Sequence, residues 1–369
     1  MKRLFSILLI LTVFLVSCAP AAAPQPSAAS VPPTEALPTP PSPPPGEPRT
    51  LTVMVHDSFS ASAGIINEFE QANNAKVTFL KSGDAGAALN TAILSKDAPQ
   101  ADVFYGVDNT FLSRAIDSGI FDSYGSPLLD RIPDEFKLDL KNRLLPVDYG
   151  DVCINYSKAF FAKNDLPVPA SLDDLLKPEY NGLFVVENPA TSSPGMAFLL
   201  ATIQKYGDPG YLDYWKALRA NGLVVVDGWE TAYYTNFSAS SGSGPQPLVV
   251  SYASSPAAEV VFSSTPLDDS PTASILAPGT CFRQVEFVGI LVGAKNRELA
   301  EKFVDFMLDV PFQEDMPLNM FVYPANSQSS LPESFVKYAQ AAPEPAAVPA
   351  DLPAKRDAWI EAWTQAVLR

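Results

Sequence analysis

From residue 51 onward, short β-rich apolar runs alternate with longer segments whose apolar residues recur at helical spacing. In the first of the longer segments, Ile65, Ile66 and Phe69 fall on one face of a helix. The short runs predict strands at 51–55, 76–80, 102–106, 183–186, 223–226, 248–252 and 285–292. The longer segments predict helices at 63–72, 85–94, 109–117, 194–205, 211–220, 229–237, 298–308 and 355–368. Such alternation is typical of mainly parallel sheets flanked by helices, so we expect an α/β fold.

The part of the chain that begins near Leu51 extends to Arg369. It is too long for one ordinary hydrophobic core, and its length predicts two lobes. No repeat is visible at the periods of solenoid proteins. After the N-terminal region, no apolar run is long enough to span a bilayer as a helix.

The N-terminus has the pattern of a secretory signal peptide, which we place at residues 1–18. Lys2 and Arg3 precede an apolar stretch, and Leu15-Val16-Ser17-Cys18 closes it. A cysteine at the cleavage point resembles the lipobox of bacterial lipoproteins, which implies that Cys18 is lipidated and becomes the new N-terminus. An ordinary signal peptide with an incidental cysteine is the alternative.

Residues 19–49 consist almost entirely of Pro, Ala, Ser and Thr. Such a composition cannot bury enough apolar surface to fold, and its prolines favour extended chain, so it predicts a disordered tether. Together with a lipid on Cys18, this tether predicts an extracytoplasmic protein anchored to the cell membrane, in the periplasm or at the cell surface.

The net charge of −16 argues against a nucleic-acid partner, which needs a basic surface. If Cys18 carries the lipid, Cys153 and Cys281 remain as an even pair in an oxidising compartment. That pairing favours a disulfide. Two buried free thiols, or one catalytic thiolate, are the alternatives.

Short polar and aromatic motifs follow the predicted strands, at the places where ligands bind in open α/β sheets. These motifs are 56–59, 108–109, 191–195, 228–229 and 251–256. Purely structural interpretations also exist, because Asp108, Ser193 and Ser255 suit helix N-caps. Trp229 suits a hydrophobic core, and His56 a solvated junction.

A set of motifs in order along the chain supports a family resemblance. They are Asp57-Ser58-Phe59, Val107-Asp108-Asn109, 146–150, 188–195, 228–233, 248–252, 255–257, 284–286, Tyr323-Pro324 and 358–369. Together they resemble the periplasmic thiamine-binding proteins, the soluble components of thiamine ABC transporters. The resemblance implies a two-lobe, type II solute-binding fold with a ligand cleft between the lobes. We expect lobe 1 at 50–147 and 253–318, and lobe 2 at 148–252 and 319–369.

The resemblance also implies ligand contacts from Asp108, Ser192, Trp229 and Tyr252. An aromatic face stabilises a cationic thiazolium, and a carboxylate or hydroxyl pairs with an aminopyrimidine. If the ligand carries a phosphate, Ser192, Ser193 and the helix that starts at Pro194 suit it. From motifs and resemblance together, the predicted ligand-binding residues are His56, Asp108, Asn109, Ser192, Ser193, Trp229, Tyr252, Ser254, Ser255 and Phe321.

The chain also departs from the family pattern. It has Ala63 and Ala258 where the family has aromatic residues, Phe321 where the family has a larger one, and His56 in place of a tyrosine. These differences bear on stacking and on which thiamine form is preferred.

We therefore predict a monomeric, non-enzymatic lipoprotein without cofactor or metal. It captures thiamine or its phosphates and delivers them to an ABC permease. One alternative is a ferric-ion-binding protein that uses His56, Asp108, Tyr233 and Tyr234 as hard ligands. The other is a thiamine-degrading transferase with Cys153 as nucleophile.

Overall fold

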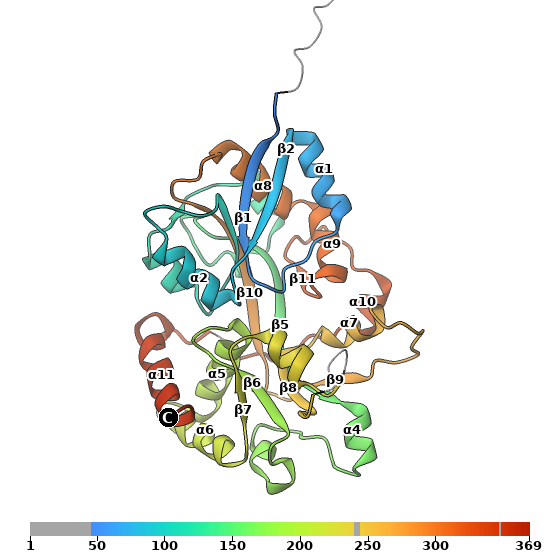
Figure 1. Cartoon of the computed structure of the whole chain (residues 1–369). Helices are drawn as coiled ribbons and strands as arrows, with labels where there is room; N and C mark the ends of the chain where they lie inside the picture. The colour runs from blue at the N-terminus through green and yellow to red at the C-terminus, as the bar shows by residue number, and fades with distance from the viewer. Residues whose placement is uncertain (1–45, 240–243, 347) are drawn as a thin grey trace, which may run out of the picture. The chain divides into compact units, whose positions relative to one another are not determined.

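The structure is a computed structural model that describes residues 46–239, 244–346 and 348–369, within one compact unit, Pro45–Arg369 (Figure 1). The predicted signal peptide with Cys18, and nearly all of the predicted tether, lie outside these residues. Within them, every helix is too short or too polar to cross a membrane.

Strands and helices alternate along most of the described chain. The strands are β1 (Arg49–Val55), β2 (Ala75–Lys81), β3 (Val103–Asp108), β4 (Phe121–Asp122), β5 (Leu145–Ser157), β6 (Phe184–Glu187), β7 (Val224–Val226), β8 (Leu248–Tyr252), β9 (Thr272–Ile275), β10 (Phe282–Leu291) and β11 (Tyr323–Pro324). The α-helices are α1 (Ala63–Asn73), α2 (Ala85–Leu94), α3 (Leu112–Asp117), α4 (Lys158–Lys163), α5 (Ser193–Tyr206), α6 (Gly210–Ala220), α7 (Ser255–Val261), α8 (Arg297–Leu308), α9 (Val310–Asn319), α10 (Glu333–Tyr338) and α11 (Leu352–Val367). A π-helical turn, η5, spans Thr231–Asn236.

The main sheet has the strand order β2-β1-β3-β10-β5-β8-β6-β7. At one end β1 pairs in parallel with β2 and β3, and at the other β6 pairs in parallel with β7 and β8. Between them β10 and β5 run antiparallel to each other and to their outer neighbours. Figure 1 shows β5 and β10 running between the group with β1 and β2 and the group with β6 and β7. Parallel pairing is confirmed for β1, β2 and β3 and for β6, β7 and β8, whereas the strand predicted at 285–292 is β10 and runs antiparallel; β10 and β5 join the two groups into one sheet.

Helix α5 is buried on all sides over Ser193–Ile203, unlike an ordinary amphipathic surface helix. It packs against β5, β6, β8, β10 and α6, which together enclose it. This packing fixes the position of its first turn, Ser193-Pro194-Gly195, at the end of β6.

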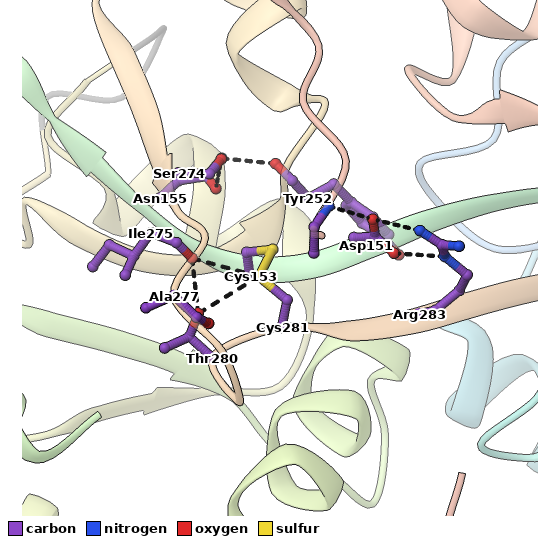
Figure 2. The surroundings of a disulfide bond; sticks show 11 residues. Asp151, Cys153, Asn155, Tyr252, Ser274, Ile275, Ala277, Thr280, Cys281 and Arg283 are labelled. Carbon is purple, nitrogen blue, oxygen red and sulfur yellow. Dashed lines mark hydrogen bonds and ion pairs between the residues drawn. A yellow bond between two sulfur atoms is a disulfide. The ribbon is translucent and has the colours of Figure 1, made fainter. Parts of the chain in front are cut away.

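A disulfide joins Cys153 in β5 to Cys281, the residue before β10 (Figure 2). The two cysteines extend the register in which Val152 faces Phe282 and Asp151 faces Arg283. Next to them Arg283 donates two hydrogen bonds to the Asp151 carboxylate, at 2.8 and 3.0 Å. The predicted disulfide is therefore confirmed. The alternatives of free thiols or a catalytic Cys153 thiolate are wrong, because both sulfur atoms are bonded.

Candidate functional site

A cavity of about 120 Å³ lies where strand ends meet helix starts. His56 and Ser58 follow β1, Asp84 precedes α2, and Ser193 opens α5. Trp229 follows β7, and Ser255 opens α7. The cavity thus lies at the edge of the sheet that the sequence motifs indicated, beyond the carboxyl ends of the strands.

Aromatic rings form one wall of the cavity. Trp229 stacks on Tyr233 with ring centroids 4.9 Å apart and an interplanar angle of 19°. The rings of Tyr234 and Tyr252 meet Trp229 edge-on, at 5.5 and 6.4 Å. Such a wall presents the electron-rich ring faces that attract a cation and the broad apolar surface that a planar heterocycle covers.

Hydrogen bonds hold Trp229 at both its backbone and its ring. Its N–H donates to Asp84 Oδ2 at 3.0 Å, and its indole Nε1 donates to Ser251 Oγ at 2.9 Å. The hydroxyl of Ser251 is in turn hydrogen-bonded to that of Ser255, also at 2.9 Å. The wall is therefore fixed in place before any ligand arrives, which lowers the ordering cost of binding.

Two carboxylates, Asp84 and Asp108, flank the start of α5, and we call them the α5 acid group. Asp84 is the N-cap of α2 and accepts from the N–H of Ala85 at 2.7 Å as well as from Trp229. Asp108 is fully buried and accepts from the Ser193 hydroxyl and, at 2.6 Å, from the N–H of Thr110. Burial raises the pKa of both carboxyl groups, and these donors oppose the rise.

A second pair, Asp148 in β5 and Glu286 in β10, lies against the cavity, and we call it the β5–β10 acid pair. The Tyr105 hydroxyl lies 2.7 Å from Asp148 Oδ2 and 3.2 Å from Glu286 Oε2. Burial raises the pKa of Asp148 to about 6, and burial with the Asp148 charge raises the pKa of Glu286 well above its usual range. Both shifts favour the protonated form of the pair over that of isolated carboxyl groups.

His56 lines the cavity beside this acid pair. Its Nε2 is 3.6 Å from Glu286 Oε1, and its Nδ1 is 3.0 Å from the Ser58 hydroxyl. Burial, with a smaller effect of the Lys81 charge, lowers the pKa of His56 to about 4, so the ring is neutral at neutral pH. A Cβ on Gly106 would lie 2.5 Å from His56 Cδ2, so the close packing of this ring requires glycine there.

Phe321 closes another side of the cavity with a backbone conformation rare for a bulky residue. Its φ of 54° lies in the left-handed region, which costs free energy for a side chain of this size. The Ser254 hydroxyl donates to the Phe321 carbonyl oxygen. Ser254 thus holds Phe321 in place instead of lining the cavity itself.

The structure brings part of the predicted set to the cavity wall. The predicted residues that line it are His56, Ser193, Trp229, Tyr252, Ser255 and Phe321. Asp108 and Ser192 are buried behind Ser193, and Asn109 binds the backbone of Arg283 and Val285 in β10. The N-cap alternative is wrong for Asp108, Ser193 and Ser255, because the caps of α3, α5 and α7 are Phe111, Ser192 and Ser254.

Several lining residues were not predicted, among them Asp84, Glu230 and Glu286. Asp84 stands at a strand-to-helix junction like the other motifs, and that position is the signal that could have found it. Tyr233, which belongs to the 228–233 motif, and Tyr234 are also ligands in the ferric alternative; both line the cavity, and the Tyr233 hydroxyl donates to Glu259. Asp108, the carboxylate of the ferric alternative, does not line it. In the described part of the chain, no cluster of three His, Cys, Asp or Glu side chains could hold a metal ion.

The fold and the cavity together are those of a solute-binding protein, with the cavity as its candidate ligand site. The family of bacterial extracellular solute-binding proteins matches residues 98–343. The chain belongs to this family.

Relatives narrow the family further. The chain is 31% identical over 306 residues to the thiamine-binding periplasmic protein of Brucella suis. The matched region covers 80% of this chain and 84% of that protein. It is 31% identical over 297 residues to the thiamine-binding periplasmic protein of Salmonella typhimurium, with coverage of 79% and 85%. A solved periplasmic thiamin binding protein superposes with a TM-score of 0.75 at 29% identity, over 87% of this chain and 97% of that one. These findings confirm the resemblance, the two-lobe fold and a binding rather than an enzymatic role.

Proposed function

We propose that this protein captures thiamine outside the cytoplasm and delivers it to an ABC permease. The observation that carries the proposal is the aromatic wall of Trp229, Tyr233 and Tyr252 beside a carboxylate, Asp84, whose Oδ2 already accepts from Trp229. The names of its relatives point to the same ligand.

The chemistry of thiamine matches this arrangement. Its thiazolium ring carries a fixed positive charge, which an electron-rich aromatic face and a nearby carboxylate both stabilise. Its aminopyrimidine is a planar heterocycle with an amino donor, which pairs with a carboxylate such as Asp84 and stacks on Trp229 or Tyr252. Binding between two ends of one sheet also lets the ligand hold the two lobes together.

Of the predicted departures from the family, Ala258 lies at the cavity and Ala63 does not line it. Phe262, one helical turn after Ala258, lines the cavity too and packs edge-on against Phe321 with centroids 5.2 Å apart. We propose that Phe262 supplies apolar surface near the position where Ala258 lacks a ring.

The remaining parts of the proposal concern the whole protein. Lipidation of Cys18 would anchor a monomer to the membrane through the Pro-rich tether, keeping the ligand near the permease. Cys18→Ser should release the protein from the membrane or block its maturation, and a variant that still partitions with lipid through its N-terminus would contradict the anchor.

The lobe boundaries stay predictions. We propose that the chain crosses between lobes within β5 and β10, because both strands pair toward each end of the sheet.

Titration calorimetry with thiamine tests the ligand. Trp229→Ala and Tyr252→Ala should each weaken binding by about 1–3 kcal/mol through lost stacking and cation–π attraction. His56→Ala should weaken it less, because a neutral imidazole supplies no counter-charge. Tyr206→Ala, which removes a ring far from the cavity, is the matched control. A wild-type protein that gives no heat with any thiamine form, yet binds ferric ion with a coloured tyrosinate band, would contradict the proposal.

A further inference from the structure

We propose that Glu259, a carboxylate behind the aromatic wall, is a specificity-determining residue for the positive charge of the ligand and acts through the ring of Tyr233. This inference rests on the proposed function and adds to it a residue outside the cavity lining. Glu259 lies in α7 and does not line the cavity, whereas Tyr233 does. Glu259 is therefore a positioning residue, and the sequence did not single it out.

The contact that carries the inference is the hydrogen bond from the Tyr233 hydroxyl to Glu259 Oε1. Both residues are buried, Tyr233 with 2% and Glu259 with 8% of its surface exposed. Burial raises the pKa of Tyr233 well above its usual range, and the Glu259 charge adds to the rise. The phenol therefore stays protonated and remains the donor. Hydrogen bonds to a charged acceptor are stronger than those between neutral groups, so this bond holds the ring firmly.

One face of α7 holds both rings of the stack in the wall. Ser255 and Glu259 are four residues apart and therefore lie on the same face of the helix. The Ser255 hydroxyl is hydrogen-bonded to that of Ser251, which accepts from the Trp229 indole. Glu259 holds Tyr233, which stacks on Trp229. Helix α7 thus fixes one ring through serine hydroxyls and the other through a carboxylate.

The segment that carries Tyr233 depends on such support. Tyr233 and Tyr234 lie in η5, and π-helical turns of this kind are rare and frequent at functional sites. The turn closes where the Phe237 N–H donates to the Ala232 carbonyl oxygen at 2.9 Å. Because a single helical turn is marginally stable by itself, contacts to neighbouring elements hold its side chains in place. The hydrogen bond to Glu259 is one of these contacts.

The charge of Glu259 favours a cationic ligand in two ways. A phenol that donates to a carboxylate has a more electron-rich ring, which strengthens the attraction between the ring and a cation. The carboxylate also attracts a positive ligand directly, and burial protects this attraction from screening by salt. Neither effect acts on an uncharged ligand of the same shape. The acids that line the cavity differ, because a ligand can touch Asp84, Glu230 and Glu286 directly.

Titration calorimetry of the full-length protein tests this inference with two probes, thiamine and its neutral analogue in which a thiophene ring replaces the thiazolium. Glu259→Gln keeps an oxygen acceptor for the Tyr233 hydroxyl and removes the charge. It should weaken thiamine binding by about tenfold and binding of the analogue by less than about twofold, so the ratio of the two affinities falls. The loss should persist in about 0.5 M salt, because the carboxylate is buried.

Tyr233→Phe is the second variant, because it keeps the ring and removes the hydroxyl that donates to Glu259. It should lower the same ratio by about threefold. If Glu259 acts through Tyr233, the free-energy losses of the two variants are less than additive in the double variant. Glu68→Gln on α1 is the matched control, since it removes the same charge from an exposed side chain away from the cavity and should leave the ratio unchanged.

Equal losses of thiamine and of the neutral analogue in Glu259→Gln would show that the residue only supports the wall, which would overturn the inference and leave the proposed function standing. Unchanged thiamine affinity in both variants would overturn it as well. If Glu259→Gln does not fold, the ratio measured with Tyr233→Phe decides by the same criterion. Failure of the wild-type protein to bind any thiamine form would instead overturn the proposed function, and the inference with it.

Discussion

The α5 acid group and the β5–β10 acid pair lie near the same cavity, but the protein provides them with different hydrogen-bond donors. Asp84 and Asp108 receive donors from backbone N–H groups and from the Ser193 hydroxyl. Asp148 and Glu286 face each other and share one principal donor, the Tyr105 hydroxyl. The two groups of carboxylates thus differ in the donors that hold them.

The difference between the two groups lies in their donors and neighbouring charges, because burial raises the pKa of the carboxyl groups in both. Burial raises the pKa in both groups, but at Glu286 the neighbouring Asp148 adds to the rise, whereas at Asp84 the main opposing effect comes from the Trp229 N–H. In the α5 acid group, backbone N–H and serine donors stabilise the ionised carboxylates against the effect of burial. In the β5–β10 acid pair the pKa shifts favour the protonated form, and we expect a bound cation beside Glu286 to oppose them.

The largest effect should come from removing the covalent link between the strands that carry the acid pair. The disulfide closes a loop with a sequence separation of 128, so the double variant Cys153→Ser, Cys281→Ser should lose about 4–5 kcal/mol of unfolding free energy. Urea unfolding followed by tryptophan fluorescence measures this loss. An unchanged unfolding midpoint would show that the cross-link does not stabilise these strands.

The next prediction concerns how much the burial of the β5–β10 acid pair lowers the free energy of unfolding. Folding raises the pKa of Asp148 from 3.8 to about 6, so between these pH values the folded state binds more protons than the unfolded state. The free energy of unfolding of the ligand-free protein should fall as pH rises across this window, and the loss persists at neutral pH. Asp148→Asn keeps an oxygen for Tyr105 without the charge and should gain on the order of 2 kcal/mol at neutral pH.

Asp97→Asn, the same substitution on an exposed residue after α2, is the control for this gain and should change stability little. If Asp148→Asn instead destabilises the protein at neutral pH, the interpretation that the charge of the acid pair lowers stability is wrong.

The smallest effect concerns proton release on binding. A cation beside Glu286 favours ionisation of the pair, so thiamine affinity should rise with pH near neutrality by at most about tenfold per pH unit. Calorimetry in buffers of different ionisation enthalpy counts the released proton. Asp148→Asn should reduce the count, whereas Asp84→Asn should weaken binding and keep it. If Asp84→Asn reduced the proton count and Asp148→Asn did not, the proposed difference between the two acid groups would be wrong.

Much of the fold could be predicted because periodicity survives in most elements. The bounds of α2 and β8 agree with the sequence prediction, α1 and α8 differ by one residue at one end, and α5 differs by one residue at each end. Strand β5 was missed because its buried positions include Asp148, Asp151 and Asn155, which hide the apolar pattern. Each of these is satisfied by a partner distant in sequence, such as Arg283 for Asp151, and sequence alone does not show that partner.

The aromatic residues of the site could be predicted because they follow strands. The carboxylate Asp84 was missed because it also serves as a helix cap. Asp84 looks like the cap of α2, which it is, and only the fold shows that Trp229 also donates to it. Asp108 was predicted at the cavity but lies one layer behind, since Ser193 stands between it and the ligand space. The sequence shows which polar residues follow a strand, but it does not show how far each side chain lies from the cavity.

Strand β5 has a further consequence for how the molecule opens. Over thirteen residues it pairs with β10, β8, β9 and β11, so most of its backbone amides are hydrogen-bonded within one continuous ladder system. Neither end of the sheet can melt completely without releasing part of this strand, and the amides at its centre should exchange with deuterium only when the whole unit unfolds. Lobe motion around the ligand would then be a bending of an intact strand, and a polypeptide cut at this strand would yield two fragments that cannot fold separately.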